Sequence, residues 1–133
     1  MQEGSTWEAI MACGHHGVDN LCAILDYNKI QQEGSVEHTM NFGPVSTKLQ
    51  AFHWAVEEMD GHDCEQICAA LQKARLQKGE PTFIVSHTTK GKGVSFMENQ
   101  AGWHGTVPLS EEELSRALAE IDAGPVLANQ RSQ

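Results

Sequence analysis

The sequence predicts an α/β fold in which a parallel sheet carries helices on both faces. Two observations support this class. Helical and strand-like patterns alternate in the order helix, strand, helix, strand, helix, strand, loop, helix, and strands joined by helices pair in parallel. Leu21–Leu25 is an unbroken apolar run, which is typical of a strand buried on both faces. Only about three strands are visible, so we expect an incomplete sheet that is swapped, oligomeric or partly disordered.

The first third of the chain predicts a helix, a strand and a loop. The helix is expected over residues 5–17, because Ser5 and Glu8 have the spacing of a capping box. The buried strand follows at residues 21–26. Residues 31–42 lack periodicity, and we expect them to form an ordered surface loop.

The middle of the chain predicts two helices around a strand. Pro44 suits the first turn of a short helix that ends near Ala51. Residues 53–59 form a less apolar strand, expected nearer a sheet edge. Asp63 and Gln66 then have capping-box spacing, and the helix after them carries an apolar stripe. The stripe consists of Cys64, Ile67, Cys68, Leu71 and Ala74.

The last third predicts a strand, a glycine-rich connector and a helix. Residues 81–86 are rich in β-formers, and the connector spans residues 90–105. Ser110 begins the terminal helix with a third capping box, and the apolar positions of this helix are Leu114, Ala117, Leu118 and Ile121. We expect residues 1–122 to form the folded domain and residues 123–133 a flexible tail.

Composition narrows the possible functions. A chain of 133 residues can bury a core, and its formal charge of −9 argues against nucleic acid as a partner. The sequence has no membrane-length apolar run and no signal-peptide pattern, so we expect a cytoplasmic protein. The four cysteines are expected to be small buried hydrophobes, with a zinc site or disulfides as alternatives; they are Cys13, Cys22, Cys64 and Cys68.

Several short motifs occur in collinear order over about residues 2–121. They are Gln2-Glu3-Gly4, Asp19-Asn20-Leu21, Asp26-Tyr27-Asn28, Asp60-Gly61-His62-Asp63, Lys90-Gly91-Lys92-Gly93 and Gly102-Trp103-His104-Gly105. With these motifs the sequence resembles the thiamine-diphosphate-binding (N-terminal) domain or subunit of transketolase. The resemblance implies the thiamine-diphosphate-binding fold, with residues 1–122 as the C-terminal half of that domain. The connector fits transketolase better than the related 1-deoxyxylulose-5-phosphate synthase.

The resemblance implies thiamine diphosphate and Mg²⁺ (or Ca²⁺) as cofactors. It assigns the Asn28 side chain and the Ile30 carbonyl to the metal, and Glu3, Lys90 and His104 to the cofactor site, with His104 as the catalytic proton shuttle. Residue type alone offers ordinary alternatives. Asn28 suits a turn, Glu3 suits the first turn of a helix, and Lys90 and His104 suit solvated loops.

The function that the resemblance implies is transfer of a two-carbon ketol unit between ketose and aldose phosphates, as in the pentose phosphate pathway. The family's Gly-Asp-Gly motif should lie just upstream of Gln2, so we expect a fragment, a truncated product or one piece of a split enzyme. The expected partners are sugar phosphates, the missing N-terminal half, a pyrimidine-binding domain or subunit, and further copies in a homo-oligomer. The alternative is a non-catalytic remnant that acts as a folding or interaction module.

Overall fold

A computed structural model describes residues 1–32, 34–105 and 107–124. The chain divides into two compact units. The first comprises residues 1–29 and 35–88, and the second comprises residues 30–34 and the chain from residue 89 onward. Among the described residues, no helix combines the length and the apolar composition that crossing a membrane requires.

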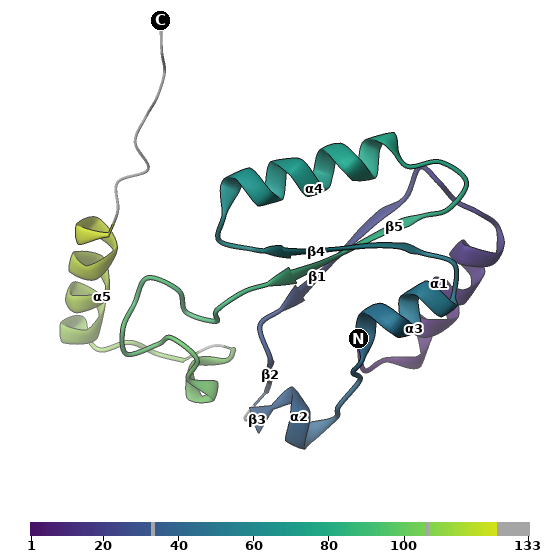
Figure 1. Cartoon of the computed structure of the whole chain (residues 1–133). Helices are drawn as coiled ribbons and strands as arrows, with labels where there is room; N and C mark the ends of the chain where they lie inside the picture. The colour runs from purple at the N-terminus through teal and green to yellow at the C-terminus, as the bar shows by residue number, and fades with distance from the viewer. Residues whose placement is uncertain (33, 106, 125–133) are drawn as a thin grey trace, which may run out of the picture. The chain divides into compact units, whose positions relative to one another are not determined.

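The first unit contains a three-stranded parallel sheet in the order β1-β5-β4 (Figure 1). Its strands are β1 (Cys22–Tyr27), β4 (Ala55–Asp60) and β5 (Thr82–His87). In β5, which is central, residues 82–86 are all buried, as expected of β-formers with neighbours on both sides. The predicted parallel pairing is confirmed, and so is the edge position of the second predicted strand.

Helices cover both faces of this sheet, as predicted (Figure 1). One face packs against α1 (Gly4–His15) and α3 (Val45–Ala51), and the other packs against α4 (Cys64–Leu76). Between α4 and the sheet, Met59, Ala70 and Ile84 form a small buried cluster. Two apolar layers therefore hold β5 in place.

The larger core cluster joins α1 and α3 to the sheet. Ile10, Leu49 and Trp54 are buried in it, and the Trp54 indole N–H donates to the Ile10 carbonyl at 2.8 Å. That bond satisfies the polar atom of an otherwise apolar side chain. Gly14 lets α1 come close, since a Cβ there would lie 1.8 Å from the Phe52 carbonyl oxygen.

The N-terminal caps of α4 and α1 match the sequence predictions to different degrees. The Asp63 carboxylate accepts from the N–H groups of Glu65 and Gln66, so Asp63 is the predicted N-cap of α4. The capping box is not complete, because the Gln66 side-chain oxygen accepts from the Asp60 N–H instead of the Asp63 N–H. The capping box expected at Ser5 is wrong, because α1 already begins at Gly4 with Glu3 as its N-cap residue, and that cap makes no side-chain bond. Ser5 therefore lies inside the first turn.

The surface loop predicted for residues 31–42 is also wrong in part. The structure has β2 (Ile30–Gln31) paired with β3 (Gly34–Ser35), and then α2 (Val36–Thr39). The Ser35 hydroxyl caps α2 by accepting from the His38 N–H at 3.3 Å. Elements of two to four residues are too short to show a hydrophobic period, so pattern reading missed them.

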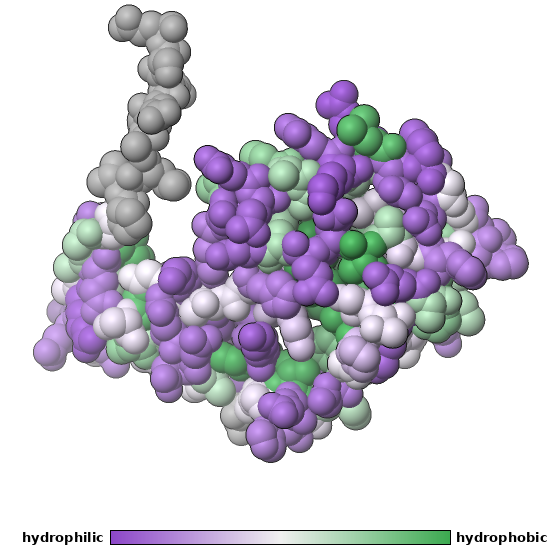
Figure 2. All heavy atoms as spheres, viewed as in Figure 1, coloured by the Kyte–Doolittle hydropathy of each residue, from purple (hydrophilic) through white to green (hydrophobic). Residues whose placement is uncertain are grey.

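The second unit carries the connector and the last helix. A 3₁₀ turn, η1 (Ala101–Trp103), precedes α5 (Glu111–Ala123), which begins with the predicted capping box between Ser110 and Glu113. Ala123 belongs to α5 rather than to a tail, and residues 125–133 of the predicted tail lie outside the described residues. Figure 2 shows hydrophobic atoms at the surface of α5, where three of its apolar side chains are about half exposed: Leu114, Leu118 and Ile121.

The expected burial of β1 and of the cysteines is contradicted. Ile24 is 56% exposed, and Cys22, Cys64 and Cys68 are exposed, while all four cysteines are unbridged. Much of the predicted α4 stripe is exposed as well, with Leu71 at 43%. The physical reason is that α4 contacts mainly β4 and β5, which leaves the Cys22 and Ile24 side chains of β1 exposed.

Candidate functional site

The carboxyl ends of the three parallel strands meet at one edge of the sheet in the first unit (Figure 1). The Thr88 hydroxyl, just after β5, donates to the Asp26 carboxylate near the end of β1. The Gly61 N–H, just after β4, donates to the His87 carbonyl at 2.8 Å. This edge is where open α/β sheets bind ligands, and here polar groups from all three strand ends are joined.

Gly61 is required by the close approach of these strand ends. A Cβ at this position would lie 2.2 Å from the Ser86 hydroxyl and 2.5 Å from a Thr88 methyl carbon. The turn after β4 can therefore rest against the end of β5 only if residue 61 has no side chain. This contact packs directly on Thr88, which bonds Asp26.

Asn28 lies just beyond the end of β1, where the sequence predicted it. Its amide nitrogen is 3.5 Å from the second carboxylate oxygen of Asp26. Lys29 follows with φ +64°, and its carbonyl accepts from the Val36 N–H at 2.9 Å, so the chain turns sharply after Asn28. Asn28 therefore lies at a turn, and its side-chain oxygen has the chemistry of a metal ligand. The two roles are compatible.

The donor types at Asn28 and Ile30 suit a hard cation but do not make a complete metal site. An amide oxygen and a backbone carbonyl are ligands that Mg²⁺ and Ca²⁺ accept. Both are neutral, and the described residues contain no group of three His, Cys, Asp or Glu side chains that could hold a metal ion. Asn28 belongs to the first unit and Ile30, in β2, to the second. Charge compensation would have to come from another group, such as a diphosphate.

Glu3 lies on the first unit, as the N-cap residue of α1. Its side chain is exposed, and its carbonyl accepts from the Thr6 N–H at 3.2 Å. The expectation from residue type that Glu3 lies in the first turn of the helix is therefore wrong by one residue, because Glu3 precedes the helix. A carboxylate at the N-cap position is still near the positive end of the helix dipole.

Lys90 and His104 lie on the second unit, at the two ends of the glycine-rich connector. The Lys90 carbonyl accepts from the Asn99 N–H at 2.9 Å, which closes residues 90–99 into a compact loop. Gly91 has φ +73° and lies too close to Met97 for any Cβ. His104 is exposed at the end of η1, and its N–H donates to the Ala101 carbonyl at 2.9 Å.

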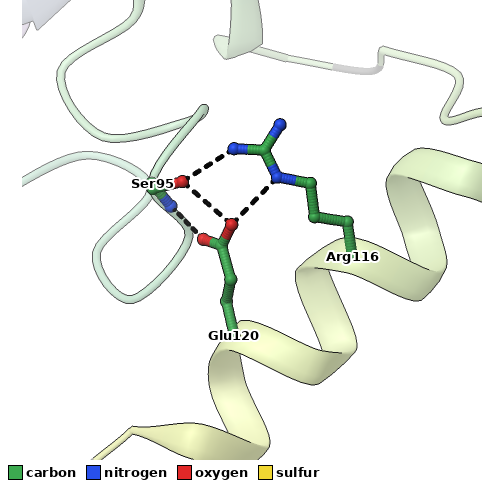
Figure 3. Close-up of polar contacts among 3 residues, drawn as sticks. All are labelled: Ser95, Arg116 and Glu120. Carbon is green, nitrogen blue, oxygen red and sulfur yellow. Dashed lines mark hydrogen bonds and ion pairs between the residues drawn. The ribbon is translucent and has the colours of Figure 1, made fainter.

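A polar cluster, which we call the Ser95 clamp, ties the connector to α5 (Figure 3). It consists of Ser95, Arg116 and Glu120. The Ser95 hydroxyl donates to Glu120 at 2.9 Å, and Arg116 donates both to Glu120 and to the Ser95 oxygen at 3.0 Å. The hydrogen bond from the Ser95 backbone N–H is the main cause that lowers the pKa of Glu120, with the Ser95 hydroxyl and Arg116 adding to it.

Aromatic contacts extend the Ser95 clamp toward His104. The Arg116 guanidinium lies 4.7 Å from the centre of the Phe96 ring, a cation–π distance. Phe96 in turn meets Trp103 edge to face, with ring centres 5.6 Å apart. Because Trp103 directly precedes His104, α5 restrains the backbone that presents the histidine.

A second polar chain in the first unit was not anticipated from the sequence. The His87 imidazole lies 2.8 Å from the Glu58 carboxylate, which also accepts from Ser46. The Ser46 and His87 hydrogen bonds lower the pKa of Glu58. His87 also meets Tyr27 edge to face, with ring centres 5.6 Å apart. It therefore links the ends of β1, β4 and β5.

Sequence reasoning found Asn28 but missed its neighbours Asp26, Thr88 and Gly61 as a group. All three follow or end predicted strands, which was the available signal. What the sequence lacked was the strand order, since only the placement of β5 beside β1 brings Thr88 to Asp26.

Comparisons with known proteins agree with this architecture. The family model described as "Transketolase, thiamine diphosphate binding domain" matches residues 1–125. One subunit of a 6-deoxy-6-sulfo-D-fructose transketolase from a Clostridium species is 38% identical over 120 residues, which is 90% of this chain and 43% of the relative. One subunit of the apulose-4-phosphate transketolase from Phocaeicola vulgatus is 42% identical over 120 residues, which is 89% of this chain and 43% of the relative.

A solved structure shows the same fold. The crystal structure of transketolase from Campylobacter jejuni superposes with a TM-score of 0.83 at 35% identity, over 91% of this chain and 19% of that chain. The present chain therefore spans less than half the length of the two subunits and about a fifth of the crystallised enzyme.

Proposed function

Because this chain belongs to the transketolase thiamine diphosphate-binding domain family, we propose that it provides the second half of the cofactor domain of a transketolase. The reaction would move a two-carbon ketol unit between a ketose phosphate and an aldose phosphate. The observation that carries the proposal is the family match over residues 1–125. The relatives named for apulose 4-phosphate and for a sulfonated fructose support sugars with an anionic end group as the substrate class.

The residues that follow β1 would contribute to binding the metal and the diphosphate. In this proposal the Asn28 side chain and the Ile30 carbonyl hold Mg²⁺ or Ca²⁺, and the diphosphate oxygens supply the negative charge that those neutral ligands lack. The position of Asn28 at the carboxyl edge of the sheet, turned by Lys29, supports this role. When bound, thiamine diphosphate supplies the carbanion and the electron sink for the transfer.

The other candidate residues would bind and move protons. His104 would hold and release a proton at the reacting substrate oxygen, a role that its exposed position at the end of η1 permits. Lys90 would bind an anionic part of the cofactor. Glu3, exposed at the start of α1, would lie toward a second copy in a homo-oligomer.

The complete enzyme would need more than these residues. We propose as partners the remainder of the cofactor domain, a pyrimidine-binding domain or subunit, and sugar phosphates, with the assembly working in the cytoplasm. The coverage of 43% of the two relatives supports the first of these partners. The isolated chain should then have no transketolase activity, because the group that activates the cofactor ring belongs to the pyrimidine-binding part.

A second candidate function is a non-catalytic folding or interaction module. One observation favours it, namely that the described residues contain no acidic or histidine cluster able to hold a metal ion alone. Under this alternative the fold would persist and the cofactor would not bind.

Calorimetric titration of the purified chain with thiamine diphosphate and Mg²⁺ separates the two functions. We expect micromolar binding that Asn28→Ala abolishes and that Asn20→Ala, an exposed asparagine just before β1, leaves unchanged. A titration with Mg²⁺ alone shows whether the metal needs the diphosphate. If the wild-type chain has a folded circular dichroism spectrum and binds nothing, the isolated chain does not hold the cofactor and the module is favoured.

A further inference from the structure

His87 ends the central strand β5 and contacts both neighbouring strands. It lies opposite Tyr27 in the pairing of β5 with β1 and opposite Asp60 in the pairing with β4. Its ring meets the Tyr27 ring edge to face, and its Nε2 lies 2.8 Å from a Glu58 carboxylate oxygen. Its backbone carbonyl accepts from the Gly61 N–H. One residue therefore connects all three strand ends at the carboxyl edge of the sheet.

Glu58 attaches the His87 imidazole to the helix layer. One of its carboxylate oxygens faces His87, and the other accepts from the hydroxyl of Ser46 on α3. The hydrogen bonds from Ser46 and His87 lower the pKa of Glu58, so the carboxylate stays charged at neutral pH and holds both partners. Because Val45 and Leu49 of α3 are buried in the core, the imidazole is attached to an element that the core fixes in place.

The Tyr27 ring is the first contact that leads from His87 to Asn28. Tyr27 directly precedes Asn28, and its ring lies between His87 and the buried Phe42. The ring centres are 5.6 Å apart toward His87 and 5.7 Å apart toward Phe42. Removing the imidazole would therefore free one side of the residue that leads into the turn.

The Asp26 carboxylate is the second contact. Thr88, directly after His87, donates its hydroxyl to Asp26, and the other oxygen of Asp26 lies 3.5 Å from the Asn28 amide nitrogen. A carboxylate only accepts hydrogen bonds, so Asp26 faces the nitrogen end of this amide and directs the oxygen end away from itself. The orientation of the Asn28 oxygen thus depends on where the end of β5 holds Thr88.

We propose that His87 is a positioning residue for Asn28: anchored by Glu58 and Ser46, it fixes the end of β1 so that the Asn28 oxygen is directed toward a divalent cation. The inference rests on the proposed function and adds to it a residue that does not touch the ligand. The His87 and Glu58 side chains are 41% and 50% exposed, and an ion pair this exposed contributes little to global stability. Its effect is therefore local, at the strand ends that it joins.

The test is calorimetric titration of the full chain with thiamine diphosphate and Mg²⁺, with urea unfolding of each variant measured in parallel. His87→Ala and Glu58→Ala should each raise the Kd about tenfold, the lower end of the effect of residues that orient metal ligands. Glu58→Gln should stay within about twofold of the wild type, because its amide oxygen still accepts hydrogen bonds from Ser46 and His87 although the charge is gone.

Glu57→Ala is the matched control. Glu57 precedes Glu58 in β4, and successive side chains of a strand point to opposite faces of the sheet. It forms an exposed ion pair of its own, with Lys73 on α4 at 2.7 Å. Removing it should leave the Kd unchanged, because this pair lies on the face away from His87.

A second readout needs no cofactor. In NMR spectra of the free chain, the side-chain amide resonances of Asn28 should shift in His87→Ala and keep their wild-type positions in Glu57→Ala. Unshifted resonances or an unchanged Kd in His87→Ala would overturn the proposal, and so would equal weakening by Glu57→Ala. Equal weakening by Glu58→Gln and Glu58→Ala would replace positioning by a direct effect of the Glu58 charge. If the wild-type chain binds no thiamine diphosphate, the proposed function fails for this chain and the Asn28 resonances alone decide the inference.

Discussion

At the scale of single residues, glycines determine how closely the elements of the first unit approach one another. Gly14 faces the Phe52 carbonyl oxygen across the contact between α1 and the segment after α3, and Gly61 faces Ser86 and Thr88 at the strand ends. In each case the neighbour would have to move to admit a methyl group. Packing therefore strongly constrains these two glycine positions, although a glycine looks unspecific in the sequence.

Gly14→Ala should lower the free energy of unfolding by about 1–3 kcal/mol, because the new Cβ would overlap the Phe52 carbonyl oxygen. In an open helix the same change would be stabilising. Gly4→Ala, in the same helix with nothing within 4 Å of its Cβ position, is the matched control and should be neutral or stabilising. Urea unfolding followed by tryptophan fluorescence measures both; equal effects would contradict the packing assigned to Gly14.

At the scale of elements, α5 acts on the connector through side chains rather than through a core. Only Ala117 of this helix is buried, and the Ser95 clamp supplies the polar attachment (Figure 3). The cluster is solvent-exposed, so each bond is weak alone, and its effect is to restrict where residues 95–104 can lie. We expect it to position the backbone before His104.

Protonation of Glu120 should open the Ser95 clamp. The pKa of Glu120 is lowered below its usual value of 4.5, chiefly by the Ser95 backbone N–H, so the clamp is complete above that value and is lost as pH falls through the lowered pKa. The Ser95 amide proton resonance should therefore shift across this acidic range in NMR spectra. Glu120→Gln should remove the shift and Glu112→Gln, elsewhere on α5, should not; a shift that persists in Glu120→Gln would refute the contact.

At the scale of the whole molecule, the candidate residues are divided between two compact units, and the chain spans less than half the length of the two relatives. Glu3 and Asn28 belong to the first unit, and Ile30, Lys90 and His104 to the second. Exposed apolar surface occurs on both, at β1 and on α5. Exposed apolar surface of this kind is typical of a surface that another polypeptide covers.

Reconstitution with the missing parts should reveal the role of His104. In an assembly that has transketolase activity, His104→Ala should reduce kcat by about 10²–10⁴, the usual contribution of general acid–base catalysis. His16→Ala, at the exposed end of α1, is the control and should keep full activity. The readout is ketol transfer between two sugar phosphates, and unimpaired kcat in His104→Ala would exclude the histidine from catalysis.

Sequence reasoning succeeded where the signal was local. The cap of α5 at Ser110, the strand character of residues 82–86 and the turn at Asn28 all follow from neighbours in the chain. It failed where a local signal was too short or was overridden. α2 has only four residues, and the capping box predicted at Ser5 does not form because α1 already begins at Gly4. The assigned roles of the site residues remain predictions.

The sequence by itself determined the alternating order of elements, the parallel α/β class and the family, because periodicity, capping and collinear motifs are properties of residues near one another in the chain. Only the tertiary structure decided that β5 lies between β1 and β4, which joins Thr88 to Asp26 across 62 positions. It alone showed that Ile24 is exposed. Strand order and exposure depend on contacts between distant residues, and a pattern read along the chain does not contain them.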